Sequence, residues 1–145
     1  MMLLRDDVAR VARAWIGTPY HHQASVLGVG TDCLGLVRGV WRDLYGRDAE
    51  MPPPYTRDWA EASGRETLLA AARLHLVASD AASIAPGDVL VFRLRAGLPA
   101  KHCAILVTEG TMIHAMERCS VAEVAFSNWW RRRLAGVFSF PGTTN

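Results

Sequence analysis

The sequence lacks a hydrophobic run of the kind that crosses a membrane, which needs about 18 uninterrupted apolar residues. Its first 17 residues also lack the apolar core of a secretion signal, because charged side chains interrupt them. These charged residues are Arg5, Asp6, Asp7, Arg10 and Arg13. We therefore expect synthesis in the cytoplasm without an export signal, and we expect no membrane partner.

Cysteine is scarce, and a strong charge of either sign is missing. The three cysteines, Cys33, Cys103 and Cys119, are an odd number without paired spacing. This argues against a disulfide framework and fits reduced thiols. The 16 basic and 14 acidic residues leave a net charge of +2, so no nucleic-acid partner is expected. We interpret the basic run 131–133 as a solvated helix face.

Internal repeats and low-complexity segments are also absent. The chain has 145 residues, half of them hydrophobic, which is enough for one domain with a proper core. We therefore expect a single globular domain over residues 1–145.

The first half of the chain shows the spacing of amphipathic helices. Apolar residues recur at steps of three and four over residues 5–16 and again from 33 to about 45, which predicts two helices. The irregular segment 20–31 predicts a loop between them. Three prolines in residues 51–55 predict an extended connector, and a third helix is expected over about 58–75.

The second half has the character of a sheet. Short runs rich in β-forming residues alternate with turns, and a short helix or turn is expected over 126–133. The predicted strands are 89–92, 102–107, 111–116, 120–124 and 137–140. Helices first and strands second predict an α+β domain, with N-terminal helices packed on one side of a small antiparallel sheet.

Cys33 is the candidate nucleophile. It lies in the first turn of the second predicted helix, directly after Asp32. Free N–H groups and the positive dipole end favour the thiolate there, and a nearby histidine can help lower a cysteine pKa from about 8.5 to roughly 3.5–7.5. Asp32 is a candidate for the helix cap and for a part in the chemistry.

A nucleophilic cysteine needs a base and a third group that orients the base. His102 and His114 lie on two neighbouring predicted strands. A three-residue turn at 108–110 would pair Val107 with Thr111 and place both histidines on one face, whereas a two-residue turn would place them on opposite faces. Gly110 suits the left-handed residue of a three-residue turn, which favours the productive register.

These residues together resemble the NlpC/p60 family of papain-like cell-wall cysteine peptidases. The resemblance rests on Gly-Thr-Pro-Tyr at 17–20, Asp-Cys-Leu-Gly-Leu at 32–36, Pro-Gly-Asp at 86–88, His102 and Ile-His-Ala at 113–115. It implies a papain-like fold, with Cys33 as nucleophile, His102 as general base and His114 as orienting residue. It also implies no cofactor and no metal.

The resemblance further implies oxyanion stabilisation by backbone N–H groups around Cys33, with Tyr20 matching a family tyrosine near the site. Asp32 and His22 are further candidates for the oxyanion and substrate-binding region. The implied reaction is cleavage of peptide cross-bridges in peptidoglycan, between D-glutamate and diaminopimelate. The sequence looks most similar to a subgroup found with tails of phages and gene transfer agents, through His-Gln-Ala at 22–24, the Pro-rich segment, Pro-Ala-Lys-His at 99–102 and the Trp-Trp-Arg-Arg-Arg run. A phage-like tail partner, and action in the periplasm or wall of a recipient cell, are therefore expected.

The sequence departs from the family pattern at two places and leaves other functions open. Leu34 replaces a serine, and residues 21–23 replace a glycine pair at the rim of the site. One alternative is a catalytically silent adaptor of a phage-like tail, and another is an acyltransferase with the same cysteine chemistry. A zinc site from Cys33, Cys103, His102 and His114 is less favoured, because adjacent residues of a strand point to opposite sides.

Overall fold

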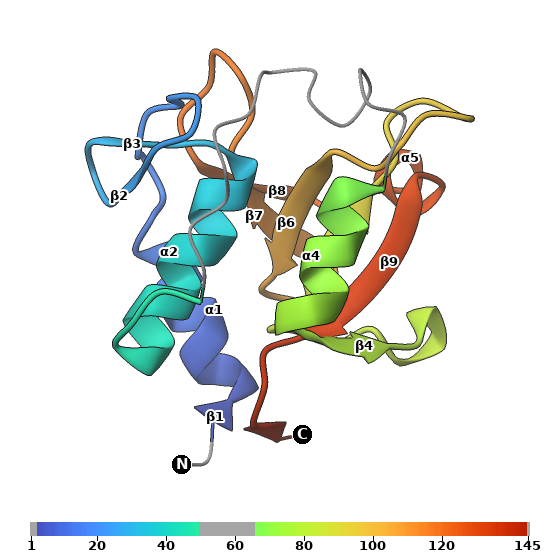
Figure 1. The fold of residues 1–145 in the computed structure, drawn as a ribbon, viewed down its shortest axis with the longest axis horizontal. Helices are drawn as coiled ribbons and strands as arrows, with labels where there is room; N and C mark the ends of the chain where they lie inside the picture. The colour runs from blue at the N-terminus through green and yellow to red at the C-terminus, as the bar shows by residue number, and fades with distance from the viewer. Residues whose placement is uncertain (1–2, 50–65, 145) are drawn as a thin grey trace.

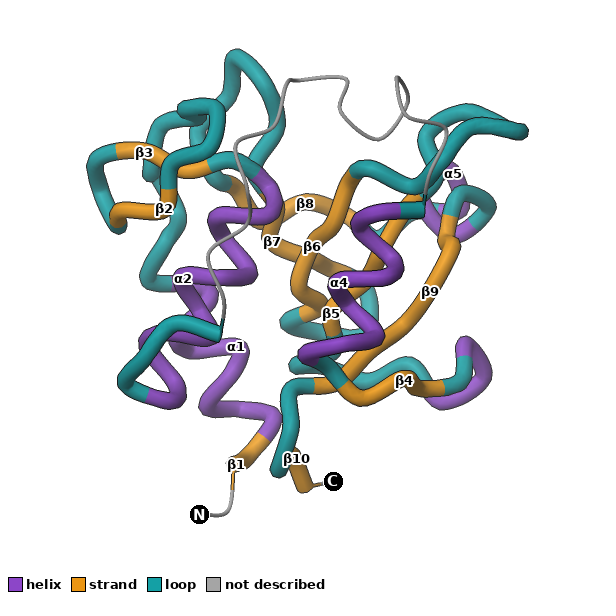
Figure 2. The backbone as a smooth tube through the Cα atoms, in the orientation of Figure 1, coloured by secondary structure: helices purple, strands orange, loops and turns teal. Residues whose placement is uncertain are grey.

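The computed structural model describes residues 3–49 and 66–144. The predicted proline-rich connector and the first part of the third predicted helix lie outside these residues. Within them, helices and strands form two layers, with three helices on one face of a sheet (Figures 1 and 2). The helices are α1 (Arg5–Arg13), α2 (Cys33–Tyr45), α4 (Thr67–His75) and the short α5 (Asn128–Arg131).

Both N-terminal helices are confirmed, and the first ends earlier than predicted. Beyond Arg13 the chain tightens, since the Trp15 and Ile16 N–H groups donate to carbonyls three residues back (both 3.1 Å). Gly17 then takes a φ of +90°, which ends the turn. Helix α2 ends at Gly46 in the left-handed conformation, as is common at helix C-termini.

Within the described residues, six strands form the main sheet. Their order is β4-β9-β5-β6-β7-β8, and each neighbouring pair is antiparallel. The strands are β4 (Val77–Ser79), β5 (Val89–Phe92), β6 (His102–Leu106), β7 (Thr111–His114), β8 (Ala122–Ala125) and β9 (Leu134–Ser139). Strand β4, which the sequence pattern did not predict, pairs at the edge with β9.

Three further elements lie outside this sheet. The predicted loop before α2 contains a small hairpin, β2 (Ser25–Val26) and β3 (Gly30–Thr31). The strands β1 (Leu3–Leu4) and β10 (Thr143–Thr144) form a parallel pair that joins the two ends of the described chain. A 3₁₀ turn covers Ala81–Ser83.

The centre of the sheet is buried on both faces, because strands β5, β6, β7 and β9 alternate their side chains between two clusters. Val89, Val91, Cys103, Ile105 and Ile113 pack toward α1, α2 and α4. The opposite face is covered by the segment around α5, and its buried residues are Leu90, Phe92, Ala104, Leu106, Met112, Phe126 and Val137. The predicted α+β architecture, with helices on one side of the sheet, is confirmed.

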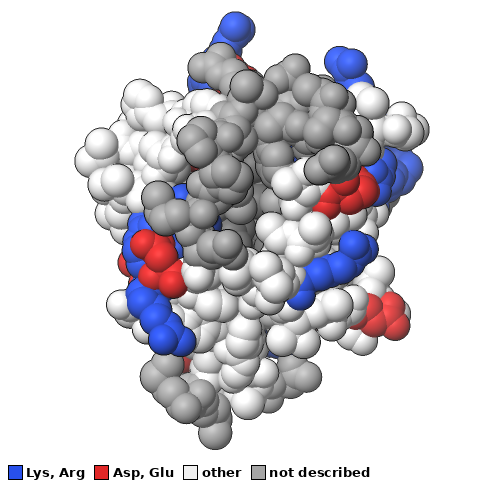
Figure 3. Space-filling model, in the orientation of Figure 1, with Lys and Arg blue, Asp and Glu red and all other residues white. Residues whose placement is uncertain are grey.

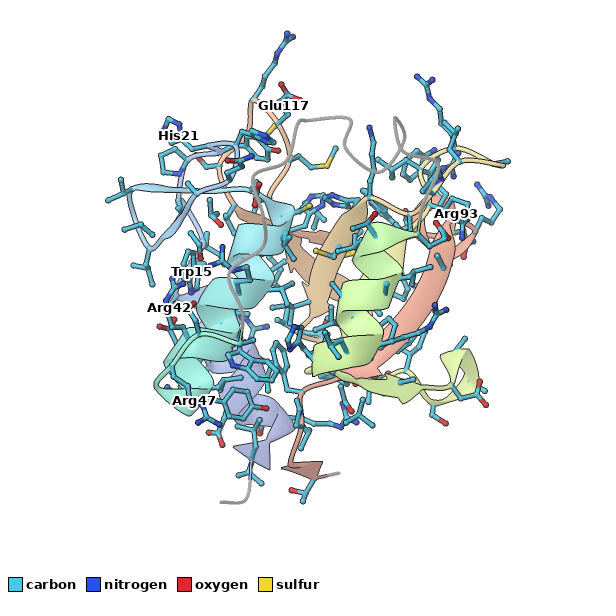
Figure 4. The ribbon with its side chains drawn as sticks, in the orientation of Figure 1. Trp15, His21, Arg42, Arg47, Arg93 and Glu117 are labelled. Atoms are coloured by element: carbon cyan, nitrogen blue, oxygen red, sulfur yellow. The ribbon has the colours of Figure 1, made fainter. Side chains whose placement is uncertain are left out.

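Glycines allow the site helix α2 to approach its neighbours. A Cβ on Gly39 would overlap the Trp15 ring, and a Cβ on Gly35 would overlap the Ala24 carbonyl. Trp15 lies beside α2 (Figure 4) and donates its indole N–H to Asp43 (3.1 Å). The glycine spacing in α2 therefore serves close packing against α1 on one side and against the loop before Cys33 on the other.

Charged side chains of both signs lie next to one another on the face shown in Figure 3, and most of the described surface on that face is uncharged. Arg42 and Asp48 form one such exposed ion pair (3.1 Å). No helix in the described part of the chain is long and apolar enough to cross a membrane.

The Pro-Gly-Asp motif ties the first helix to the sheet. Asp88, which is fully buried, accepts from the Arg5 guanidinium (2.8 Å) and from the Ala85 N–H (3.0 Å). Arg5 also donates to the Pro86 carbonyl (3.0 Å), and Gly87 has a φ of +95° against the Arg5 backbone. One carboxylate thus fixes both the turn before β5 and the start of α1.

We predict that Asp88→Ala lowers the free energy of unfolding by about 3 kcal/mol, because removing one partner of a buried ion pair leaves the other uncompensated. The control is Arg10→Ala, which removes the exposed ion pair with Asp7 (3.4 Å) and is expected to cost less than about 1 kcal/mol. Urea denaturation of the two variants and the wild type measures the difference. Equal losses in the two variants would contradict the structural role of Asp88.

Candidate active site

Asp32 shapes the start of α2. Its Oδ1 accepts from the Gly35 N–H (2.7 Å), which makes it the helix cap, and its Oδ2 accepts from the Gln23 N–H (2.8 Å). The side chain is buried, so both oxygens face the backbone. The cap predicted at this position is confirmed, and the same carboxylate holds the preceding loop against the helix that begins with Cys33.

The loop before α2 forms one rim of the site. Tyr20 is half-buried, and its backbone forms an isolated parallel β-bridge with Thr31. The His21 N–H donates to the Thr31 carbonyl (3.1 Å). Gln23 has a left-handed φ of +65°, held by its bond to Asp32. His22 is half-buried in this loop. The substrate-binding roles of Tyr20, His22 and Asp32 stay predictions.

A second rim comes from the far end of the sheet. Figure 4 places His21 and Glu117 at the same end of the molecule as the start of α2. The two segments are joined by backbone hydrogen bonds, Gly17 N–H to Val121 carbonyl and Val121 N–H to Thr18 carbonyl (both 2.8 Å). The segment after β7 and the segment before β2 are therefore joined at this end of the molecule.

The register between β6 and β7 is the productive one that the three-residue turn predicts. Ile105 lies opposite Ile113, and the Val107 N–H donates to the Thr111 carbonyl (3.0 Å). This register places His102 and His114 on the same face as diagonal neighbours.

The expected reason for this register is wrong, because Gly110 is not in the left-handed conformation. The turn is instead stabilised by side chains. The Thr108 and Thr111 hydroxyls lie 2.6 Å apart, the Gly110 N–H donates to Thr108 Oγ1 (3.2 Å), and Thr111 Oγ1 donates to Glu123 (2.7 Å).

His102 and His114 form a direct hydrogen-bonded pair. The distance from His102 Nε2 to His114 Nδ1 is 3.0 Å, and the side chains are only 5% and 7% exposed. Burial, aided by the positive charge of His102, lowers the pKa of His114 to about 4. His114 is therefore neutral at ordinary pH, and its Nδ1 can accept a hydrogen bond from the Nε2–H of His102. This fixes the His102 tautomer and leaves Nδ1 as the ring nitrogen available to a thiol.

The Cys33 thiol lies where β6 begins. Its Sγ is 3.7 Å from the Lys101 carbonyl, next to His102 in the chain. The pKa of Cys33 is held well below its usual range, first by a hydrogen bond from Cys103 and then by a hydrogen bond from His102 and its positive charge. Burial and the negative charge of Asp32 act in the opposite direction and raise this pKa. These contacts favour the thiolate, which is the nucleophilic form.

Cys103 is a part of the site that the sequence reasoning missed. It was interpreted as a core residue and is indeed 1% exposed, but its Sγ also donates to the Cys33 carbonyl (3.2 Å). The hydrogen bond to Cys33 and burial raise the pKa of the Cys103 thiol, so this thiol stays protonated as a donor. The signal was the strand alternation itself, which points residue 103 toward the helix layer that contains α2.

In the described residues, no group of three or more His, Cys, Asp or Glu side chains is placed to hold a metal ion. The zinc alternative would need such a group from Cys33, Cys103, His102 and His114.

A thiol at a helix start, an imidazole beside it and a second imidazole behind the first define the thiol–imidazole class of hydrolase sites, here on a papain-like α+β fold. The sequence model of the NlpC/P60 family matches residues 17–139. The chain belongs to this family, whose members are cysteine peptidases and peptidoglycan hydrolases. No curated protein matches the chain by sequence.

Several solved structures share this fold. An NlpC/P60 family protein from Bacillus cereus ATCC 10987 has a TM-score of 0.67 and 20% identity, covering 97% of this chain and 41% of that chain. The NlpC/p60 domain of the peptidoglycan hydrolase SagA has a TM-score of 0.62 and 24% identity, covering 94% and 98%. The peptidoglycan hydrolase RipB from Mycobacterium tuberculosis has a TM-score of 0.58 and 18% identity, covering 93% and 63%. The chain thus spans less than half of the Bacillus protein and nearly all of the SagA domain.

We predict that Cys103→Ala moves thiolate formation at Cys33 to higher pH, because the variant loses the donor that stabilises the thiolate. Ultraviolet absorbance of the thiolate, followed across a pH titration, measures the midpoint. Cys103→Ser keeps a donor and is expected to fall between the wild type and Cys103→Ala. Cys119→Ala removes an exposed thiol and serves as the control; a Cys103→Ala midpoint equal to the control's would exclude the effect.

Proposed function

We propose that the protein is a cysteine peptidase that hydrolyses peptide cross-bridges of bacterial peptidoglycan, at the bond between D-glutamate and diaminopimelate. The observation that carries the proposal is the buried pair of His102 and His114, hydrogen-bonded at 3.0 Å, beside a Cys33 thiol with a lowered pKa. Family membership and the fold shared with two peptidoglycan hydrolases support the substrate class.

The reaction follows from the protonation states of the site. The Cys33 thiolate attacks the amide carbonyl carbon, and backbone N–H groups at the start of α2, with Tyr20 beside them, stabilise the oxyanion. His102 gives its Nδ1 proton to the leaving amine as the C–N bond breaks, which leaves a thioester on Cys33. Neutral His102 then takes a proton from water, the resulting hydroxide attacks the thioester, and the acid product and the Cys33 thiolate are released.

His114 acts through His102 in this scheme. Because its pKa is about 4, His114 stays neutral. It accepts a hydrogen bond from the Nε2–H of His102 whether His102 is neutral or protonated. The acceptor keeps Nδ1 aimed at the thiol and disperses the positive charge that forms when His102 is protonated. A third residue of this type fixes orientation and is not itself protonated during the cycle.

Digestion of purified peptidoglycan tests the proposal, with the products separated and weighed by mass spectrometry. The wild type is expected to release peptides with a newly freed diaminopimelate amine, and Cys33→Ala is expected to release none. His114→Ala is expected to slow the reaction by about a hundredfold or more, because a misoriented imidazole loses its acid–base contribution.

Two other results would redirect the proposal. Products that are the same with the wild type and Cys33→Ala would favour a silent adaptor. Products that carry an added amine in place of water would favour an acyltransferase. Cys119→Ala is the matched control, since it removes a thiol outside the site.

We also propose that the protein is a component of a phage-like tail that opens the wall of a recipient cell, where its substrate lies in the periplasm. Support comes from the His-Gln-Ala, Pro-Ala-Lys-His and Trp-Trp-Arg-Arg-Arg segments, which resemble the tail-associated subgroup. Mass spectrometry of particles purified from the producing cells is expected to detect the protein in the tail fraction. Its presence in the cell extract alone would contradict this role.

A further inference from the structure

Trp130 lies over the histidine pair from the sheet face opposite the helices. Its ring centroid is 5.4 Å from that of His102, with the planes 29° apart, and 5.4 Å from that of His114, with the planes 86° apart. One indole therefore stacks on the first imidazole and meets the second in a T-shaped contact. Neither the general chemistry of the cysteine nor the motif comparison assigns a role to this residue.

A second aromatic ring, that of Phe92, contacts both His102 and Trp130. Phe92 is fully buried and lies 6.1 Å from His102 with the planes 30° apart, and its ring is 4.8 Å from that of Trp130. Aromatic carbon surfaces offer no acceptor that competes for a ring N–H. The two aromatic rings contact each other and together cover one side of His102, which restricts its rotation, and His114 is its hydrogen-bond partner.

The short helix α5 depends on its own contacts to hold Trp130 in place. The Trp129 ring packs edge-on against Trp130 at 4.8 Å, and the Arg133 guanidinium lies 3.6 Å above Trp129. Arg133 also donates to the Trp129 carbonyl (2.8 Å), and its own carbonyl accepts from the Arg93 N–H (2.8 Å). The first two arginines of the basic run 131–133 are exposed, as expected for a solvated face, whereas Arg133 supports Trp129 and through it Trp130.

We propose that Trp130 is a positioning residue, which holds His102 and His114 in their hydrogen-bonded geometry and keeps water away from the bond between them. This proposal rests on the proposed function in one respect, which is that His102 and His114 act on the Cys33 thiol. Its basis is that a single side chain contacts both imidazoles of a buried pair.

The electrostatics of His114 follow from this cover. His114 pairs with Ala122 of β8 and lies opposite Ala104 of β6, and neither titrates. The charged group that acts on it is His102, and α5 presents to it the neutral indole of Trp130. Burial is the main cause of its lowered pKa of about 4. Removing the indole exposes His114 to water and so raises its pKa toward the usual value of about 6.5.

Alkylation of Cys33 by iodoacetamide, measured across pH, tests the proposal without any peptidoglycan. In Trp130→Leu, His114 becomes protonated at a higher pH and can then no longer accept the hydrogen bond from His102. The pH at which the alkylation rate falls on the acid side, called the acid limb, is therefore expected to rise. About one pH unit below the new midpoint, the variant is expected to react about tenfold more slowly than the wild type. At alkaline pH the rates converge. Histidine NMR titration of the same samples is expected to show a raised His114 midpoint.

Two further variants keep the test decisive. Trp129→Leu removes the neighbouring, exposed indole, which contacts Trp130 but neither histidine, and its limb is expected to move less than that of Trp130→Leu. Trp130→Phe keeps an aromatic ring that covers less of the pair, and its limb is expected to lie between those of the wild type and Trp130→Leu. It carries the test if the leucine variant does not fold. An acid limb and a His114 midpoint that match the wild type in the folded Trp130 variants would overturn the proposal. Because peptidoglycan is not used, that result is independent of whether the protein cuts the wall.

Discussion

The site depends on the pairing register between β6 and β7. A sheet alternates its side chains with a period of two, so a slip of one residue would carry His114 to the face occupied by the helices. The register is fixed at one point, where Val107 meets Thr111, and by the hydroxyl contacts of Thr108 and Thr111. The histidine pair, the tautomer of His102 and the aromatic cover around it all follow from that pairing.

The two faces of β6 take part in the site in different ways. His102 points toward the aromatic face, where it contacts His114, Phe92 and Trp130. Cys103 points toward the helices and contacts Cys33. A strand between two layers can therefore connect a thiol on a helix with a histidine pair on the other face of the sheet. Asp32 does the corresponding work on the helix side, since it fixes the first turn of α2 and the loop before it with the two oxygens of one carboxylate.

Much of this arrangement was predictable from the sequence, because it rests on local signals. Helical spacing located α2, Asp32 was a suitable cap, and strand alternation with a three-residue turn placed the two histidines together. Other features depend on contacts between distant segments. The sequence pattern did not predict β4, which is a short edge strand. Gly110 suggested a left-handed turn residue, whereas the turn is stabilised by hydrogen bonds of the Thr108 and Thr111 hydroxyls. Cys103 was recognised as buried, but its bond to Cys33 joins residues 70 positions apart.

The pairing of β1 with β10 brings Leu3 next to Thr143, at the end of the molecule away from the start of α2 (Figure 1). A segment attached at either end would therefore leave from the same side, with the rims of the site facing the other way. This geometry would let another domain be attached at this end without crossing the start of α2. It also makes both ends suitable for fusion, because an added domain there would not lie over the loops that border Cys33.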